Sequence, residues 1–455
     1  MKYFPLLAAL ALGACTMTPS ANAPATRSVQ VESALPPMKV FQAPAPVAPR
    51  MSNGTIAADF LSLHFQLESG RELPTFTRFE GPITVGVTGK PPASLGPDLS
   101  RLLTRLRNEA GIDIRNIRSG AQQPNIVIEA VSRSDIRRAL PQAACFVVPN
   151  VTSLDEYRRN RRSEKTNWAQ LERRTQMAIF LPYDASPQEV RDCLHEELAQ
   201  ALGPLNDLYR LRESVFNDDN VHTVLTGFDM LILRATYDPT LRSGMTRNQV
   251  AARLPAILTA LNPGGNAVPG QPQQATPRSW INAIQKALGP GSSAGERRSA
   301  VNEALAIAQN AGWGDHRRAF SHYIAGRMTQ SYDAQLAQRH YASADRFFRQ
   351  TPGTELHQAY LAAQTAAYAV SQADGPKALR LINTALPTAK RAENAALLAT
   401  LMLIQAEAYE LTGDFDTARA VRLDSLGWAR YGFGSDWAVR AKMREISSLN
   451  PAPRS

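Results

Sequence analysis

The fold of this chain is decided by the stretch Glu196-Glu197-Leu198-Ala199-Gln200-Ala201-Leu202-Gly203-Pro204-Leu205-Asn206-Asp207, which has the pattern of a helix followed by a turn. The helix is expected to begin at Ser186-Pro187-Gln188-Glu189, because serine caps a helix, proline suits its first position and glutamate completes a capping box. Leucine and alanine recur at helical spacing and predict a buried face, whereas Glu196 and Gln200 lie one turn apart on another side. The glycine-proline pair then predicts a turn that brings the end of the stretch back toward the same region.

Four strand-like segments precede this helix and predict a mixed sheet. They are short runs rich in isoleucine, valine and phenylalanine, at residues 83–87, 125–131, 144–148 and 177–181. Between the first two, leucines from Leu99 to Leu106 recur at helical spacing before Gly111, which predicts a helix packed across the sheet. We therefore expect an α+β domain at residues 55–255.

The helix and turn resemble those of the metzincin peptidases, such as the matrixins, which carry His-Glu-x-x-His-x-x-Gly-x-x-His. By position, Glu196, Gln200 and Asn206 stand where the zinc-binding histidines would be, whereas Glu197 and Gly203 keep the general-base glutamate and the glycine. Downstream, the segment at residues 214–216 is similar to the Met-turn with phenylalanine in place of methionine, and residues 225–239 are similar to the closing helix. The resemblance implies a zincin-like fold with a degenerate metal site.

The same region is also similar to a proteobacterial family of predicted lipoproteins with no assigned function. The similarity rests on Cys193 to Glu197, Gln200 to Asp207, Phe216 to Asp219 and Gly244-Met245. It implies an exported, lipidated protein and brings no known substrate with it.

The substituted positions determine which chemistry we expect. Zinc in peptidases is held mainly by neutral imidazole nitrogens, and one carboxylate with two amides is a poor replacement for them. The metal candidates Glu196, Gln200 and Asn206 form an oxygen set that would suit calcium better than zinc. We therefore expect no cofactor, and Glu197 would be a catalytic base only if the domain were an active hydrolase.

The alternative to a metal site is a polar cleft in which carboxyl and amide groups satisfy one another. Amides both donate and accept hydrogen bonds, so glutamine and asparagine can pair with neighbouring acids where a cation would otherwise sit. The cleft would consist of Glu196, Glu197, Gln200, Asn206 and Asp207.

Two histidines near this stretch are not placed in a site. If the metal-binding motif began one residue earlier, His195 would be its first metal ligand. The second ligand would then stand one turn later at Ala199, which has no ligating atom in its side chain. His222 is an isolated loop histidine, and such residues are usually hydrogen-bonded within the protein or exposed.

The N-terminus predicts export and lipid attachment. Lys2 precedes the short apolar run from Phe4 to Leu12, which is too short to span a bilayer and reads as a signal peptide over residues 1–14. Leu12-Gly13-Ala14-Cys15 resembles the bacterial lipobox, so Cys15 is the predicted lipidation site; the alternative is an ordinary signal peptide with an accidental cysteine. Thr16 is unlike an inner-membrane retention signal, which favours the outer membrane, facing the periplasm. Residues 15–54 are expected to form a disordered tether.

Composition argues against a nucleic-acid partner and predicts one disulfide. The chain has 455 residues and a formal net charge of +10, but arginine outnumbers lysine and the basic residues are not concentrated in one segment, so we expect no nucleic-acid partner. Besides Cys15 there are only Cys145 and Cys193, and an isolated pair in an oxidising compartment predicts a bond between them.

The second half of the chain predicts a helical repeat domain. Residues 256–277 are rich in proline, glycine, glutamine and asparagine and are interpreted as a linker. Residues 278–455 then have small and apolar residues at spacings similar to those of tetratricopeptide helix pairs; the alternative is a plain helical bundle. The tryptophans at positions 280, 313, 428 and 437 are expected to be packing anchors. The repeat-like positions are Ala366, Ala378, Ile382 and Ala385, and then Ala406, Tyr409, Gly413, Phe415 and Ala418.

Together these features predict a lipid-anchored cell-envelope protein of unassigned process. We expect a non-catalytic binding or assembly module, held on the membrane through Cys15, with a protein partner bound by the helical repeats. The alternative is an atypical envelope hydrolase, either metal-dependent or carboxylate-based.

Overall fold

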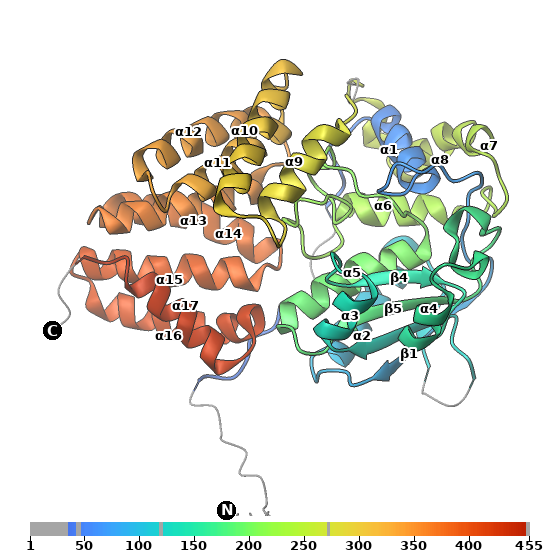
Figure 1. Ribbon diagram of the computed structural model, residues 1–455, viewed down its shortest axis with the longest axis horizontal. Coiled ribbons are helices and arrows are strands. Elements are labelled where there is room, and N and C mark those ends of the chain that lie inside the picture. The colour runs from blue at the N-terminus through green and yellow to red at the C-terminus, as the bar shows by residue number, and fades with distance from the viewer. Residues whose placement is uncertain (1–34, 42–46, 118–121, 271–273, 452–455) are drawn as a thin grey trace, which may run out of the picture. The chain divides into compact units, whose positions relative to one another are not determined.

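The computed structural model describes residues 35–41, 47–117, 122–270 and 274–451. Within Leu35–Ser455, which forms one compact unit, a region with a five-stranded sheet is followed by a region of helices (Figure 1). We call residues 53–261 the sheet region and residues 278–447 the helical region. The predicted signal peptide and Cys15 lie outside the described residues. Among the helices of the described part, none is both long and apolar enough to cross a bilayer.

The sheet is mixed, as predicted, with the strand order β2-β1-β3-β5-β4. Its first three neighbour pairs are parallel, and β4 runs antiparallel to β5 along one edge. All four predicted strands are confirmed; the fifth strand, β2, was missed because it is only three residues long and buries a single isoleucine. The strands are β1 Ile83–Gly89, β2 Ile114–Asn116, β3 Ile126–Val131, β4 Phe146–Pro149 and β5 Met177–Pro182.

Alternate residues of β5 pack against helices on opposite faces of the sheet, as the two-residue period of a strand requires. Ile179 belongs to the large core formed with α2, α5 and α6, whereas Phe180 belongs to a smaller cluster formed with α3 and α4. Because both faces are covered, every residue of β5 is buried. The helices of this region are α1 Asn53–Phe65, α2 Leu95–Ala110, α3 Arg133–Ala139, α4 Leu154–Asn160, α5 Pro187–Leu202, α6 Gly227–Thr236, α7 Arg247–Ala251 and α8 Leu254–Leu261, with short 3-10 turns at Glu164–Thr166, Trp168–Gln170 and Pro263–Asn266.

The leucine-rich helix predicted before Gly111 is α2, and the predicted stop is confirmed. Gly111 has a φ of 69°, a left-handed conformation that glycine adopts without a steric penalty, and its N–H is bonded to the carbonyl of Leu106. The helix therefore ends where its last buried residue, Ala110, meets the loop to β2.

The second half is helical, which confirms the coarse prediction for this region. Consecutive helices pack side by side through small buried residues, for example Ala366 in α13 and Ala378 in α14. Short connections favour such neighbouring pairs. The helices are α9 Arg278–Leu288, α10 Ala294–Asn310, α11 His316–Thr329, α12 Ala334–Gln350, α13 Glu355–Ser371, α14 Gly375–Arg391, α15 Ala395–Leu411, α16 Phe415–Phe433 and α17 Asp436–Ser447.

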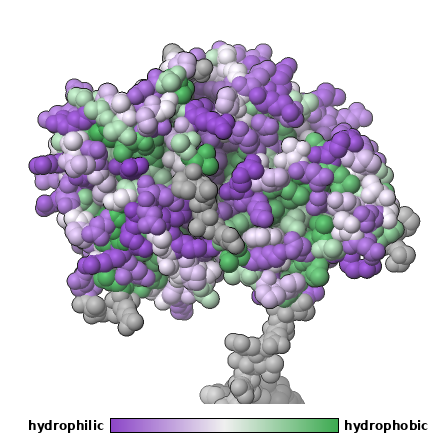
Figure 2. Space-filling model, turned by 180° about the vertical axis from the view of Figure 1, so that it is seen from behind, coloured by the Kyte–Doolittle hydropathy of each residue, from purple (hydrophilic) through white to green (hydrophobic). Residues whose placement is uncertain are grey.

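The tryptophans of the helical region do not share one role. Trp280 and Trp313 are buried and pack edge to face, 5.5 Å between ring centroids, which confirms them as packing anchors. Trp437 is 74% exposed, so the prediction for that residue is wrong. Its helix, α17, lies at the end of the helical region and presents that side chain to solvent. Figure 2 shows hydrophobic areas scattered among hydrophilic side chains on the face it displays.

Part of the segment predicted as a tether packs against α16. Lys39 N donates to the carbonyl of Gly427 at 3.0 Å, and Arg430 donates to the carbonyl of Pro36 at 2.8 Å. Phe41 stacks on Trp428 with 4.5 Å between ring centroids. Residues 35–41 are therefore bound along a helix, because a buried phenylalanine and backbone hydrogen bonds offset their ordering entropy.

Helix α5 contacts the helical region directly. Arg191 of α5 donates to Glu393 at 3.2 Å, and both side chains are largely buried. Beside this pair, the Gln188 amide donates to the Asn394 side chain at 3.2 Å. The helix that carries the candidate site is thus held by the sheet on one side and by the residues before α15 on the other.

Candidate functional site

The start of α5 is positioned by the local signals that predicted it. The hydroxyl of Ser186 accepts from the backbone N–H of Glu189 at 3.2 Å, and Pro187 occupies the first turn. The predicted disulfide between Cys145 and Cys193 is present. Because Cys145 immediately precedes β4, this bond attaches the middle of α5 to the edge of the sheet.

The end of α5 is capped by two side chains that sequence reasoning did not assign to it. The buried guanidinium of Arg174 donates to the carbonyls of Gln200 and Gly203, and the hydroxyl of Tyr237 donates to the carbonyl of Leu202 at 3.1 Å. A cation at a helix C-terminus is electrostatically favourable. Burial lowers the pKa of Arg174 to about 10, which still leaves it charged at neutral pH. Nothing near Arg174 in the sequence signals this contact.

Gly203 has a different role from the one expected of a turn glycine. Its φ of −179° is extended, a conformation open to any residue. A β-carbon there would lie 2.8 Å from a methyl carbon of Thr236 and 3.0 Å from a ring nitrogen of His64. Glycine is therefore required at this position by close packing of α5 against its neighbours.

The structure brings together four of the five predicted cleft residues. Glu196 and Gln200 are half-buried on one side of α5, and the Gln200 amide donates to the Asp207 carboxyl at 3.2 Å. Glu197 is 5% exposed, and its Oε2 has no hydrogen-bond partner among the described residues. Electrostatic repulsion from Glu196 acts on both Glu197 and Asp207, which places these acids in one cluster.

Asn206, the fifth predicted residue, is directed elsewhere. It is buried, and its amide donates to the carbonyl of Ser62 at 3.1 Å near the end of α1. The preceding residue, Leu205, donates its N–H to the carbonyl of Leu63 at 2.7 Å. The turn after α5 is thus bound to α1, and this long-range contact is what orients Asn206.

Burial and mutual repulsion raise the pKa values of the clustered acids. Burial, followed by the negative charges of Glu68 and Asp218, raises the pKa of Glu196 to about 8. Burial and then the charge of Glu196 raise the pKa of Glu197 well above its usual range. Burial, a hydrogen bond with Glu68 and the charge of Glu196 do the same for Asp207. Burial therefore favours the protonated form of each carboxyl group, and in that form the group can donate hydrogen bonds as well as accept them.

Glu68 and Asp218 extend this cluster and were not predicted. Glu68 follows α1, and Asp218 lies in the long loop between α5 and α6, where its carboxyl accepts from Gln285 of α9 at 3.3 Å. Burial and then the charge of Glu68 raise the pKa of Asp218 to about 6. Glu68 comes from a segment distant from α5 in sequence, whereas Asp218 lies in the loop after α5, within the stretch Phe216 to Asp219, which was not assigned to the cleft.

The residues at the three substituted positions do not fit a zinc ion. Gln200 and Asn206 present amides, which are weak ligands, and both amides are engaged with the chain itself. Glu196 is the one carboxylate among the three, and a single carboxylate with two amides is unlike the imidazole and thiolate sets that hold zinc. Among the described residues, no group of three or more histidine, cysteine, aspartate or glutamate side chains is arranged to hold a metal ion.

The nearby histidines have structural partners. His195 is buried and its Nδ1 accepts from the N–H of Leu225 at 3.1 Å, while burial lowers its pKa well below the usual value. His222 donates from Nε2 to the carbonyl of Arg212 at 3.0 Å, and burial lowers its pKa to about 4. Both are neutral at physiological pH and hold the long loop after α5 in place.

The segment at residues 214–216 forms a turn fastened to the start of α6. Ser214 donates its hydroxyl to Asp229, whose carboxyl also accepts from the N–H of Val215 at 3.2 Å and of Thr226 at 2.7 Å. Phe216 is fully buried. The turn belongs to the loop between α5 and α6 and is anchored by the capping box that begins α6.

Comparison with known proteins adds one match. Residues 53–256 match a family described as protein of unknown function (DUF2927). No curated protein and no solved structure matches the chain. The expectation of a family without assigned function is confirmed for this region, whereas its lipoprotein and metzincin aspects stay predictions.

Proposed function

We propose that this protein is a lipid-anchored protein of the cell envelope that binds a protein partner and does not catalyse hydrolysis. Its sheet region would be a degenerate metzincin-like scaffold, and its helical region a tetratricopeptide-like array. Lipid at Cys15 would hold both on the outer membrane, facing the periplasm.

The observation that carries the non-catalytic part is the engagement of the two amides at the substituted positions. The amide nitrogen of Gln200 donates to Asp207 and that of Asn206 donates to the carbonyl of Ser62, so contacts within the chain orient both side chains without a cation. Glu197, at the general-base position, is buried, and burial and then the charge of Glu196 raise its pKa well above the usual range, which disfavours the ionised form that a base needs to accept a proton. The order of elements, with a sheet, then α5, a turn and α6, supports the likeness to the scaffold.

A groove in the helical region supports the binding part. Helices α12, α13 and α14 line a cavity of about 460 Å³. Its walls combine apolar side chains such as Tyr341 and Leu381 with the exposed basic residues Lys377 and Arg380. Stacked helix pairs commonly bind an extended peptide on such a surface, and the basic residues suit a partner segment with acidic side chains.

A photocrosslinking experiment tests the binding part in the native envelope. We expect a photoreactive residue at Thr384, inside the groove, to give a discrete protein adduct, and one at the exposed Glu303 of α10 to give none. Lys377→Glu together with Arg380→Glu should remove the adduct, whereas Arg440→Glu on α17 should keep it. Equal adducts from both probe positions, or none from either, would show that the groove is not the binding surface.

An activity and metal assay separates this function from the alternative hydrolase. The raised pKa of Glu196, about 8, is the feature that would suit a carboxylate-based hydrolase, because it provides a proton donor at neutral pH. We expect the purified full-length protein to hydrolyse peptides and cell-wall fragments no faster than its Glu197→Gln variant. Stoichiometric metal, or activity that Glu197→Gln abolishes and Glu303→Gln retains, would establish the hydrolase instead.

A further inference from the structure

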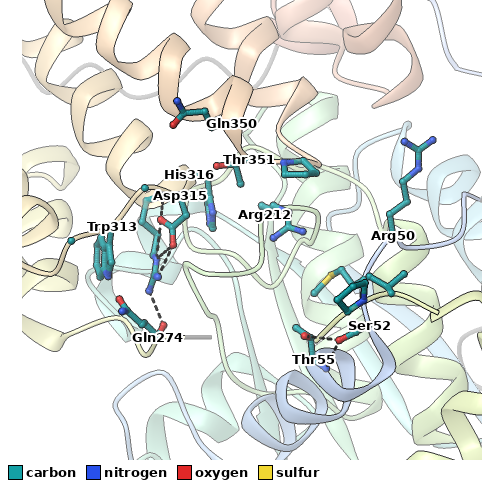
Figure 3. Close-up of a pocket in the computed structure, with 17 residues that line it drawn as sticks. Arg50, Ser52, Thr55, Arg212, Gln274, Trp313, Asp315, His316, Gln350 and Thr351 are labelled. Carbon is teal, nitrogen blue, oxygen red and sulfur yellow. Dashed lines mark hydrogen bonds and ion pairs between the residues drawn. The ribbon is translucent and has the colours of Figure 1, made fainter. Parts of the chain in front are cut away.

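A second cavity, of about 670 Å³, lies away from the predicted cleft and from the groove. It is lined by the segment before and at the start of α1, by the loop after α5, and by the connections that lead into α11 and out of α12 (Figure 3). None of the predicted cleft residues lines it. Its volume is in the range of sites that enclose a small molecule.

Two arginines that line this cavity lack a carboxylate partner. Neither Arg50 nor Arg212 forms an ion pair within 4.0 Å with any residue that the structure describes, whereas Arg317 in the same wall is paired with Asp315 at 2.7 Å. Arg212 is half-buried, and its Nε is buried without a hydrogen-bond partner in the described part of the chain. A buried guanidinium nitrogen without a partner costs free energy that a bound anion would recover.

The acidic groups near these arginines form no ion pair with them within 4.0 Å in the described part of the chain. Glu213 is close enough for Arg212 and Arg50 to act on it electrostatically, but burial outweighs them and raises its pKa above the usual value. Asp59, the other acid near Arg212, is paired with Arg210 at 2.8 Å. The cavity therefore has an excess of positive charge, and field lines concentrate in such recesses.

Polar groups around the arginines suit an anion with further hydrogen-bonding atoms. Ser52 is the N-cap of α1, and it lines the cavity together with Thr55, so the positive end of that helix faces the same space. His316 is 4% exposed and donates from Nε2 to the carbonyl of Tyr209 at 2.7 Å. Its Nδ1 consequently carries a lone pair, and this atom has no partner among the described residues.

In Figure 3, Ser52 and Thr55 lie on one side of the cavity and Asp315 and His316 on the other, with Arg212 between them, while the side chain of Arg50 extends away from Arg212. We propose that this cavity binds a small ligand that carries an oxyanion, either a carboxylate or a phosphate, held by the guanidinium group of Arg212 and, from the exposed rim of the cavity, by that of Arg50. The planar fork of a guanidinium matches both groups through paired hydrogen bonds. This site is independent of the proposed binding groove, because the two share no residue.

Calorimetric titration of the full-length protein with inorganic phosphate, and separately with succinate, tests the proposal. We expect saturable binding of at least one of the two, and the anion that binds identifies the group that the site takes. Arg212→Gln and Arg50→Gln should each weaken binding by about tenfold or more, because each removes a charged hydrogen bond. The matched control Arg419→Gln, on an exposed arginine of α16, should leave the affinity unchanged.

Three outcomes would overturn the proposal. They are the absence of saturable binding of either anion up to about 10 mM, an affinity that both cavity variants retain, and an equal loss in Arg419→Gln. Arg50 is exposed, so Arg50→Gln is expected to fold. If Arg212→Gln does not fold, the binding measured with Arg50→Gln still tests the proposal. Melting curves of each variant without ligand establish which of them are folded.

Discussion

At the scale of single residues, burial decides how the acid and amide side chains near the end of α5 form hydrogen bonds with one another. Glu196, Glu197 and Asp207 are close enough for their charges to interact, and burial favours the protonated form of each. A protonated carboxyl beside an amide forms hydrogen bonds without any cation. This arrangement makes the stability of the folded protein depend on pH, because the buried carboxyl groups are favourable only while they are protonated.

The first prediction concerns stability as a function of pH. The folded pKa of Glu196, about 8, exceeds the unfolded value of 4.5, so the folded state binds more protons between these values. The stabilising contribution is complete below the unfolded pKa and is lost as pH rises through the folded one. Urea unfolding should therefore show stability falling between about pH 5 and pH 8.

The variant Glu196→Gln should lose about 1–2 kcal/mol less unfolding free energy over this pH range than the unmodified protein. This is less than the full pKa shift of Glu196 implies, because solvent partly screens the half-buried side chain. The matched control is Glu303→Gln on an exposed face of α10, which should keep the slope of the unmodified protein. An identical pH dependence for Glu196→Gln and the unmodified protein would exclude this account of the cluster.

A second prediction at the residue scale concerns Arg174. Replacing it by alanine leaves the carbonyls of Gln200 and Gly203 without their buried donor, which should lower the free energy of unfolding by about 2–4 kcal/mol. The neighbouring Arg173 is exposed, and Arg173→Ala should change stability by less than about 0.5 kcal/mol. Equal effects of the two substitutions, measured by urea unfolding, would mean that Arg174 does not stabilise the end of α5.

At the scale of elements, α5 is the helix on which the other parts converge. It packs on β5, is attached to the residue before β4 by a disulfide, and contacts the residues before α15 through Arg191. Its position is therefore restrained along its whole length. A restrained helix suits a scaffold, since the carboxyl cluster keeps its hydrogen bonds only if α5 and the following turn stay in register.

The prediction at this scale concerns the disulfide. The bond closes a loop with a sequence separation of 48 residues, and its removal should lower the free energy of unfolding by about 3–4 kcal/mol through the entropy of the unfolded chain. The comparison is between the oxidised protein and the double variant Cys145→Ala, Cys193→Ala in urea unfolding. Reductant should destabilise the first and leave the second unchanged, and insensitivity of the first would contradict the prediction.

At the scale of the whole molecule, residues 35–41 place the beginning of the described chain on the helical region. The backbone of Lys39 is bonded to Gly427, and Phe41 stacks on Trp428. Arg101 of α2 also donates to the carbonyl of Phe41 at 2.7 Å, so the segment contacts both regions. The segment therefore joins the sheet region to the helical region through backbone hydrogen bonds to each.

The prediction at this scale concerns the anchor. Cys15→Ala should move the protein from the membrane fraction to the soluble fraction of the envelope, because acyl chains contribute about 0.8 kcal/mol per buried methylene and no other anchor is predicted. Labelling with a radioactive fatty acid should be lost in the same variant. Cys145→Ala is the control that should keep both the label and the membrane association.

Much of the fold could be predicted from patterns that act within a few residues. The cap at Ser186, the stop at Gly111 and the apolar runs of the strands depend on neighbours in the chain, and the structure confirms all of them. The three-residue strand β2 was missed because it is too short to show a period. The packing of residues 35–41 was missed because their composition resembles that of a tether, whereas their contacts lie on α16.

The candidate site could be predicted only in part, because some of its contacts join residues that are far apart in the chain. Gln200 and Asp207 meet as expected because one turn of helix and one short loop separate them. Asn206 is directed toward Ser62, and Glu68 joins the cluster, through contacts between α1 and the loop after α5. Nothing in the local sequence encodes those contacts.

Residue type and near neighbours were enough to predict most strands, the helix α5, the pairing of Cys145 with Cys193 and a stretch without histidine at positions 196, 200 and 206. The packed fold was needed to show that Arg174 caps α5, that burial favours the protonated form of the clustered acids, and that Arg50 and Arg212 line one cavity. The physical reason is that burial, and the hydrogen bonds of residues far apart in the chain, arise only when separate elements pack together.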